Sequence, residues 1–217
     1  MVTALFLLLA VLGSQVSHGT VPASSGFRYH VNTIPTYVSL IAAEWALVYS
    51  IWKAGLGRGA KLADLIGRIP RGTRLLQDVG FGLLVFACWT GWLVAQANLL
   101  PDRQTSIQSF LPRSSAEVLF WVALAISAGI CEEIVFRGYL QHQFEALIQS
   151  RWVAVVAQAA LFGAAHVYEG GQASTTIMAY GLILGALAGW RRNLAPGIIA
   201  HVGSDLLPLL LPTTWGH

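Results

Sequence analysis

The sequence has few charged residues for its length, and this scarcity restricts the class of protein. Only 11% of its 217 residues are Asp, Glu, Lys or Arg, whereas soluble domains contain about 25%. Hydrophobic residues make up 55% of the chain, and its mean hydropathy is +0.62. A composition of this kind is typical of membrane proteins rather than of soluble globular domains.

Cysteine is also scarce, and several site motifs are missing. Cys88 and Cys131 are the only two cysteines, and both lie in apolar segments. A disulfide framework and a zinc site built from paired cysteines are therefore not expected. The HExxH pattern of zinc proteases does not occur. The chain also contains no internal repeat, and we expect no nucleic-acid partner.

Seven apolar segments predict an all-α membrane protein, a multi-span helical bundle of about seven transmembrane helices. A spanning helix needs about 20 residues, and most segments meet this length once their ends are extended. The first is short and resembles the apolar part of a signal peptide, but no basic residue precedes it. We interpret it as a retained first span. The segments are residues 3–13, 36–54, 75–100, 116–140, 152–168, 173–190 and 194–211.

The basic residues predict how the spans are oriented. If the N-terminus is cytoplasmic and the spans alternate, nine of the 13 Lys and Arg residues face the cytoplasm and three face outward, with Arg137 inside a helix. This bias follows the positive-inside rule, so we expect a multi-pass integral membrane protein with a cytoplasmic N-terminus. Indole rings favour the headgroup region, and the predicted cytoplasmic ends carry Trp52, Trp152 and Trp190.

A basic cytoplasmic connection at residues 54–74 has helical periodicity. Its apolar residues recur at intervals of three and four: Leu62, Leu65, Ile66 and Ile69. We interpret it as a short amphipathic helix on the inner leaflet, with membrane lipids as partners. The alternative is a solvated loop. Further along, Ser114 and Ser115 precede Glu117 in a pattern typical of a helix start.

Several ionisable residues lie in segments that are otherwise apolar. A charged side chain at the centre of a spanning helix costs at least about 2.5–3.5 kcal/mol on insertion scales. A chain that retains several such residues on separate segments is expected to use them together. They are Glu132, Glu133, His166, His201 and Asp205.

Glu132 and Glu133 are expected to have different roles. Adjacent residues on a helix point about 100° apart, so the two carboxylates are not expected to face the same partner. Glu133 and Arg137 are four residues apart and share a face, which predicts a structural ion pair. Glu132 is then free to face the bundle centre as a general base. The alternative is that all three are solvated at the cytoplasmic end of the helix.

The two histidines follow on later segments, in motifs that are weak alone. Phe162 and His166 share one helix face, and His201 and Asp205 share another. Each histidine has an alternative interpretation as a hydrogen-bonded packing residue. Together with Glu132 they form a set that can activate water and stabilise an oxyanion. Their depths are a difficulty, because Glu132 lies toward the cytoplasmic end of its predicted span and His166 toward the outer end.

The order and spacing of these motifs resemble the CAAX-protease and bacteriocin-processing (CPBP, or Abi) family of intramembrane proteases. The family pattern is EExxxR, then FxxxH, then HxxxN or HxxxD on successive helices. This chain has EEIVFR at 132–137, FGAAH at 162–166 and HVGSD at 201–205. The similarity suggests a catalytic helical core at residues 115–211, preceded by N-terminal transmembrane helices at 1–114.

The resemblance implies an intramembrane endopeptidase, a hydrolase that cleaves a peptide or lipidated protein, prenylated or not, within or beside the membrane. It implies that Glu132 and His166 activate water and that His201 and Asp205 stabilise the oxyanion. Asp205 stands where the family pattern has Asn or Asp, and a carboxyl group, unlike an amide, donates a hydrogen bond only when protonated. Otherwise Asp205 orients His201 or helps bind a metal.

The cofactor and the activity each have an alternative. We favour chemistry without a cofactor, but a divalent metal such as zinc is compatible with a ligand set of His166, His201 and Asp205. A non-catalytic membrane scaffold or regulator with the same fold is the alternative to an enzyme. A proton-coupled transporter also fits buried Glu and His, although no inverted repeat supports it.

Overall fold

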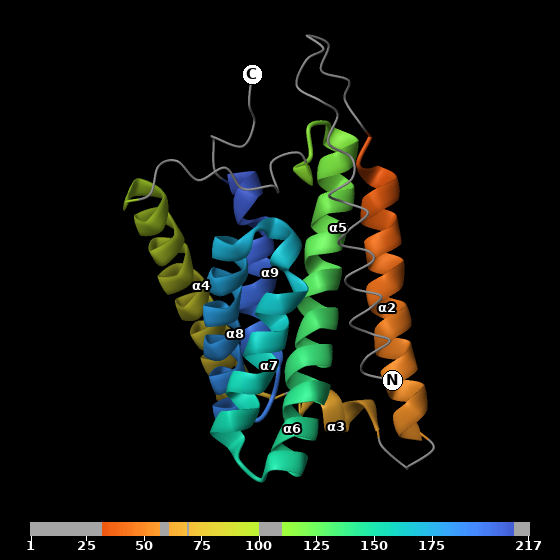
Figure 1. Ribbon diagram of the computed structural model, residues 1–217, viewed down its shortest axis with the longest axis vertical. Helices are drawn as coiled ribbons and strands as arrows, with labels where there is room; N and C mark the ends of the chain where they lie inside the picture. The colour runs from red at the N-terminus through yellow and green to blue at the C-terminus, as the bar shows by residue number, and fades with distance from the viewer. Residues whose placement is uncertain (1–31, 57–60, 69, 100–109, 211–217) are drawn as a thin grey trace.

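The computed structural model describes residues 32–56, 61–68, 70–99 and 110–210 as a bundle of helices (Figure 1). The long helices are α2 (Ile34–Leu56), α4 (Thr73–Leu99), α5 (Ser115–Glu132), α7 (Arg151–Ala165), α8 (Gly171–Arg191) and α9 (Ala195–Leu210). Shorter elements are α3 (Leu62–Ile66), the π-helix η2 (Glu133–Leu140), α6 (Gln141–Ile148) and the 3₁₀ turn η3 (Val167–Glu169). No strand occurs within these ranges, so the predicted all-α class is confirmed.

Four of the helical segments are long and apolar enough to cross a membrane: Ile34–Gly55, Thr73–Leu99, Ser115–Ile148 and Gly171–Arg191. Helices α7 and α9 are apolar but shorter. Six of the seven predicted spans thus correspond to helices, and the predicted span at 3–13 lies outside the described residues. These segments indicate an integral membrane protein.

The helix that begins with α5 runs further than the sequence predicts. The apolar run suggests an end near residue 140, but η2 and α6 continue it to Ile148. The helix continues through polar residues because side chains in this segment contact other helices of the bundle. Gln141 is buried, and its Nε2 donates to the carbonyl of Gly185 at 3.1 Å. Phe144 packs against the main hydrophobic core.

The start of α5 is fixed by a capping box, at the position that the sequence predicts. The Ser114 hydroxyl accepts from the Glu117 amide at 3.2 Å, and a carboxylate oxygen of Glu117 accepts from the Ser114 amide at 3.1 Å. The other carboxylate oxygen accepts from the Thr33 amide at 3.1 Å. One buried glutamate therefore ties the beginning of α2 to the beginning of α5.

The predicted amphipathic helix of the basic connection is α3, and it is shorter than expected. It ends at Gly67, whose φ of 75° favours glycine. Leu65 and Ile66 pack against the protein core rather than being free for lipid. The Leu194 amide donates to the Ile66 carbonyl at 3.2 Å. In Figure 1 α3 lies at the base of the bundle, and Gly67 at its end forms an isolated β-bridge with Asn193 in the turn between α8 and α9.

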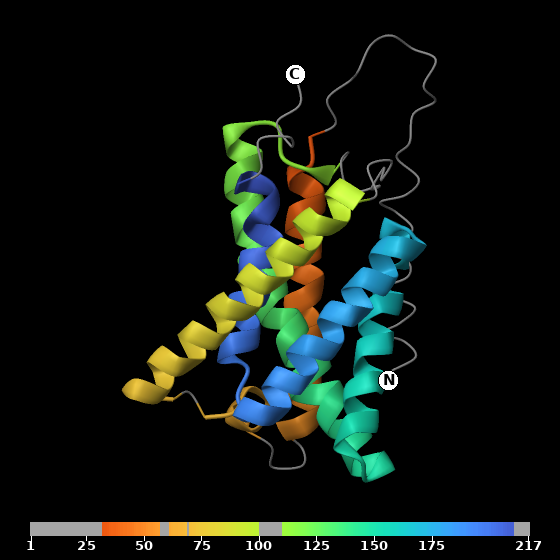
Figure 2. The same ribbon diagram turned by 90° about the vertical axis from the view of Figure 1, so that its left-hand side faces the viewer.

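Helices α5 and α9 form the centre of the bundle. Helix α9 packs against both α4 and α5, while α2 runs beside α5 and α7 pairs with α8. In Figure 1 α5 lies between α2 and the α7–α8 pair, and Figure 2 shows the same bundle from the side. Gly129 permits the close approach of α5 to α9, because a Cβ there would lie 2.5 Å from Val202 Cγ2. Small residues serve this purpose in membrane helix packing.

Candidate active site

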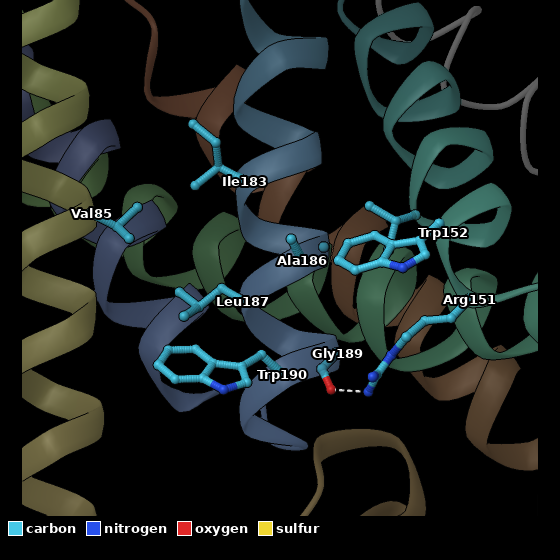
Figure 3. Close-up of a pocket in the computed structure, with 10 residues that line it drawn as sticks. Val85, Arg151, Trp152, Ile183, Ala186, Leu187, Gly189 and Trp190 are labelled. Atoms are coloured by element: carbon cyan, nitrogen blue, oxygen red, sulfur yellow. Dashed lines mark hydrogen bonds between the residues drawn. The ribbon is translucent and has the colours of Figure 1, made fainter.

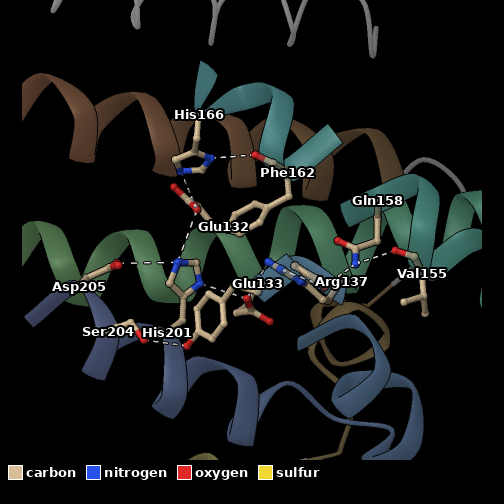
Figure 4. Close-up of polar contacts among 12 residues, drawn as sticks. Glu132, Glu133, Arg137, Val155, Gln158, Phe162, His166, His201, Ser204 and Asp205 are labelled. Carbon is tan, nitrogen blue, oxygen red and sulfur yellow. Dashed lines mark hydrogen bonds and ion pairs between the residues drawn. The ribbon is translucent and has the colours of Figure 1, made fainter. Parts of the chain in front are cut away.

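The three sequence motifs meet at one depth, although the sequence places them at different depths. Glu132 lies 16 residues before Ile148, about 24 Å along a helix that rises 1.5 Å per residue. Helix α7 then returns over a similar distance from Arg151 to His166. The predicted difference in depth between Glu132 and His166 was wrong, because the sequence prediction ended the α5–α6 helix too early. Figure 4 shows Glu132 between His166 and His201.

The Glu132 carboxylate faces both histidines across short gaps. Its Oε2 lies 4.0 Å from His166 Nε2 and 3.7 Å from His201 Nε2. Both separations are too long for direct hydrogen bonds. This oxygen is buried and accepts no hydrogen bond from the described residues, while the Glu132 side chain as a whole is 22% exposed.

The His166 ring is oriented by its own helix. Its Nδ1 lies 2.8 Å from the carbonyl oxygen of Phe162. A carbonyl only accepts, so Nδ1 carries the hydrogen, and Nε2 is the nitrogen turned toward Glu132. The Phe162 ring also packs edge-on against the imidazole, with 4.9 Å between ring centroids. The spacing of the FGAAH motif therefore fixes which nitrogen of His166 faces the site.

The His201 ring is oriented by Glu133, which lies where α5 continues into η2. Its Nδ1 lies 3.1 Å from Glu133 Oε1, and the same oxygen lies 2.8 Å from Arg137 Nη1. The Glu133 and Arg137 side chains are fully buried, which rules out the alternative that they are solvated at a helix end. His201 Nε2 points toward Glu132 and toward Asp205, whose Oδ2 is 3.8 Å away.

One expectation about these carboxylates is wrong. Glu132 and Glu133 do share a partner, because the His201 ring places one nitrogen toward each. The π-helix starts at Glu133, and elements of this kind often mark functional sites. Gly197 leaves room for the Glu133 carboxylate beside His201, since a Cβ at position 197 would lie 2.7 Å from Glu133 Oε2.

Arg137 connects this arrangement to two further helices. Its guanidinium carbon lies 4.2 Å from the centroid of the Phe162 ring, in cation–π geometry. Its Nη2 donates to the Gly181 carbonyl at 3.5 Å, which also accepts from Gln158 Nε2 at 2.9 Å. The ion pair therefore contacts α7 and α8 through Arg137 and contacts His201 of α9 through Glu133.

Asp205 lies at the more exposed edge of the site, with its side chain 31% exposed. Beside it the Ser204 hydroxyl donates to the Ala200 carbonyl at 3.0 Å. The Tyr180 hydroxyl lies 2.9 Å from the same Ser204 oxygen, and it is the donor because the Ser204 hydrogen is already used. The Tyr180 and His201 rings are 6.0 Å apart. Sequence reasoning did not identify Tyr180.

Glu44 of α2 is a further acidic residue that sequence reasoning missed. Ser127 Oγ donates to its Oε2 at 2.8 Å. Glu44 also interacts electrostatically with three site residues: Glu132, Asp205 and His201. The signal was present, because Glu44 is the single charged residue between residues 36 and 52. Glu132 was selected as an ionisable residue in an otherwise apolar segment, and Glu44 meets the same criterion.

The candidate metal ligands do not assemble into a binding site. Across the ranges that the structure describes, no group of three His, Cys, Asp or Glu side chains is arranged to hold a metal ion. This covers the set His166, His201 and Asp205. The geometry therefore offers no coordination shell on which to base a metal step, and the preference for chemistry without a metal stays a prediction.

Comparison with known proteins supports the same interpretation of the motifs. A family model described as type II CAAX prenyl endopeptidase Rce1-like matches residues 114–207, the part of the chain that carries all three motifs. No curated protein and no solved structure matched the chain. The family match supports a CAAX-protease-type intramembrane endopeptidase, with a membrane-associated peptide as the substrate class. The predicted resemblance is thus confirmed: residues 114–207 are similar to the Rce1-like type II CAAX prenyl endopeptidases, which is consistent with the CPBP family.

Proposed function

We propose that the protein hydrolyses a peptide bond of a membrane-associated substrate with a water molecule activated by Glu132. The observation that carries the proposal is the position of Glu132 Oε2, 4.0 Å from His166 Nε2 and 3.7 Å from His201 Nε2. Gaps of this size are too long for direct bonds and suit a bridging water. A carboxylate and an imidazole that share a water can position it and accept its proton.

The hydrolytic step follows from the orientation of these groups. The water oxygen attacks the peptide carbonyl carbon while its proton passes to Glu132, and a tetrahedral oxyanion forms. The C–N bond then breaks, and Glu132 returns the proton to the leaving amine. His166 contributes Nε2 as the acceptor that aligns the water, since its Nδ1 hydrogen is committed to the Phe162 carbonyl.

His201 and Asp205 are proposed to stabilise the oxyanion. The His201 Nδ1 hydrogen is committed to Glu133, so only a protonated ring can donate from Nε2 toward the reacting centre. Asp205 adds a second donor if it carries a proton. Preorganised donors at a developing charge contribute about 2.7–4 kcal/mol each in comparable enzymes.

The substrate is proposed to reach the site from within the membrane region. Glu132 and Asp205 are partly exposed, whereas Glu133 and Arg137 are fully buried. In both ribbon views the α7–α8 hairpin ends short of the tops of α2 and α5 (Figures 1 and 2). The family description names prenyl endopeptidases, so a peptide with a lipidated C-terminus is the substrate class to test first.

The orientation in the membrane is proposed from the charges at the base of the bundle. The end that carries α3 also carries most of the described basic residues: Lys53, Lys61, Arg68, Arg71, Arg74, Arg151, Arg191 and Arg192. Arg113 lies at the opposite end, beside the start of α5. The positive-inside rule places the α3 end in the cytoplasm.

The activity is tested with purified protein in liposomes and membrane-anchored peptides, with and without a prenyl group, in ¹⁸O-labelled water. We expect two fragments, with one ¹⁸O atom in the newly formed carboxylate. The assay is repeated after metal analysis and with a chelator present, and unchanged turnover is expected. Intact peptides throughout would contradict an endopeptidase. Activity lost with the chelator and restored by a metal would contradict the glutamate-only step.

A further inference from the structure

A groove lies over the surface of α8 near its C-terminal end (Figure 3), and none of the residues that line it belongs to the Glu132 site. Its volume is about 410 Å³, within the range of about 300–1,000 Å³ that is usual for small-molecule sites. Helices α4, α7 and α8 supply its apolar walls, among them Val85, Val155, Ile183 and Leu187. No acidic residue lies among the described residues that line it.

Two tryptophans mark the level of the groove in the membrane. Trp152 near the start of α7 is 67% exposed, and Trp190 near the end of α8 is 60% exposed. Indole rings concentrate at the headgroup level of a bilayer. The wall residue Ile183 lies about two helical turns from Trp190, toward the hydrocarbon region. The groove therefore extends from the headgroup level into the acyl-chain region of one leaflet.

A basic side chain lies at the headgroup end of this groove. The Arg151 guanidinium rests on the backbone of α8, where it donates a hydrogen bond to the Gly189 carbonyl. A Cβ at position 189 would lie 3.2 Å from Arg151 Nε, so the missing side chain lets the guanidinium lie close. One hydrogen bond leaves most of its five donors available, and no described carboxylate pairs with it.

We propose that this groove binds an anionic phospholipid of the adjacent leaflet, with its phosphate at Arg151 and an acyl chain along the apolar wall of α8. Basic pockets between transmembrane helices bind anionic headgroups, and charge complementarity selects an anionic lipid over a neutral one. Arg192 is exposed one residue beyond the end of α8, and it adds positive charge at the same level. None of the groups that surround Glu132 lines the groove, so the site is separate from the proposed catalytic centre.

The test is native mass spectrometry of the full-length protein in a neutral detergent, titrated with dioleoyl phosphatidylglycerol or dioleoyl phosphatidylcholine. We expect phosphatidylglycerol to bind about fivefold more tightly, the ratio that corresponds to about 1 kcal/mol per basic residue near the surface. Arg151→Gln should remove this preference, and Arg151→Lys should keep most of it. Arg113→Gln is the matched control, because Arg113 is an exposed arginine at the opposite end, and it should change nothing.

A second measurement does not depend on the folding of an Arg151 variant. Brominated phosphatidylglycerol should quench the fluorescence of Trp152 and Trp190 more than brominated phosphatidylcholine, and the difference should shrink in Trp152→Phe and Trp190→Phe. Equal binding of the two lipids, or a preference that survives Arg151→Gln, would overturn the proposal. Displacement of phosphatidylglycerol by a prenylated peptide at equal concentration would also overturn it and assign the groove to the substrate.

Discussion

At the scale of single residues, the orientation of His201 depends on a buried ion pair on another helix. Arg137, Glu133 and His201 form a chain of contacts at 2.8 and 3.1 Å, and this chain determines which imidazole nitrogen faces the site. A buried ion pair is weak evidence for stability, because desolvation offsets the attraction. We therefore infer that the pair serves mainly to position His201, a role that the i, i+4 spacing alone does not reveal.

Removing one member of this pair should cost more than removing both. Arg137→Met leaves the Glu133 charge buried without its partner, so we expect a loss of about 3–5 kcal/mol in the free energy of unfolding. The double variant Glu133→Gln/Arg137→Met leaves no unpaired charge and should recover most of that loss. Unfolding in a denaturing detergent measures both. A double variant no more stable than the single one would show that the pairing does not govern stability here.

Asp205 gives a second prediction at this scale. If its role is to donate a hydrogen bond to the oxyanion, Asp205→Asn should retain activity within about tenfold, because an amide donates without first binding a proton. Asp205→Ala should lose more, up to about the 10²–10³-fold loss expected for one oxyanion donor. The measurement is kcat for peptide cleavage. Equal losses in the two variants would show that the carboxylate itself is needed.

At the scale of helices, element lengths decide whether the motifs meet. Sequence periodicity located α2, α4, α5, α7, α8 and α9 within a few residues, because long apolar runs have clear ends. It placed the end of the α5–α6 helix eight residues early, because Gln141 looks solvated in the sequence but is buried against Gly185. That error alone separated Glu132 from His166. Tertiary contacts of this kind are not visible in a single sequence.

The sequence also limited how much of the site could be predicted. Glu132, Glu133, His166 and His201 stood out because the surrounding segments are apolar. The contact between Glu133 and His201 joins residues 68 positions apart, and no local pattern indicates it. Tyr180 was missed for a different reason, since a tyrosine in an apolar helix is ordinary in composition and only its bond to Ser204 connects it to the site.

The contact between α5 and α9 gives a prediction at the helix scale. Gly129→Ala would place a Cβ 2.5 Å from Val202 Cγ2 and 3.0 Å from the Val202 amide nitrogen. We expect α9 to move away from α5, with a lower unfolding temperature and reduced kcat. Gly91→Ala in α4 is the matched control, since its Cβ meets nothing within 4 Å and alanine favours helix by about 0.5–1 kcal/mol. A Gly129 variant that matches the control would contradict this packing.

At the scale of the whole molecule, the bundle separates a basic end from a polar site at mid-depth. The basic end carries α3 and the exposed tryptophans Trp52, Trp152 and Trp190, as the sequence predicted. The proposed catalytic groups lie on α5, α7 and α9, which meet inside the bundle. This arrangement suits a substrate whose anchored end lies in the bilayer while its peptide bond reaches Glu132.

The proposed orientation is tested by labelling single cysteines in a variant without Cys88 and Cys131. Cysteine at Arg71, near α3, should react with a membrane-impermeant maleimide only after the cells are opened. Cysteine at Arg113 should react in intact cells. Both positions are exposed in the structure, so their reaction with the maleimide should depend only on which side of the membrane each one faces. The reverse pattern of labelling would contradict a cytoplasmic α3 end.

The most direct test of the account is the turnover of Glu132→Gln on a membrane-anchored peptide that the unmodified protein cleaves. The amide keeps the shape of the side chain but cannot accept the proton of water, so we predict a fall in kcat of about 10²–10⁴-fold. Glu145→Gln in α6, outside the site, is the control and should cleave normally. Turnover of Glu132→Gln equal to that of the unmodified protein would contradict the central claim.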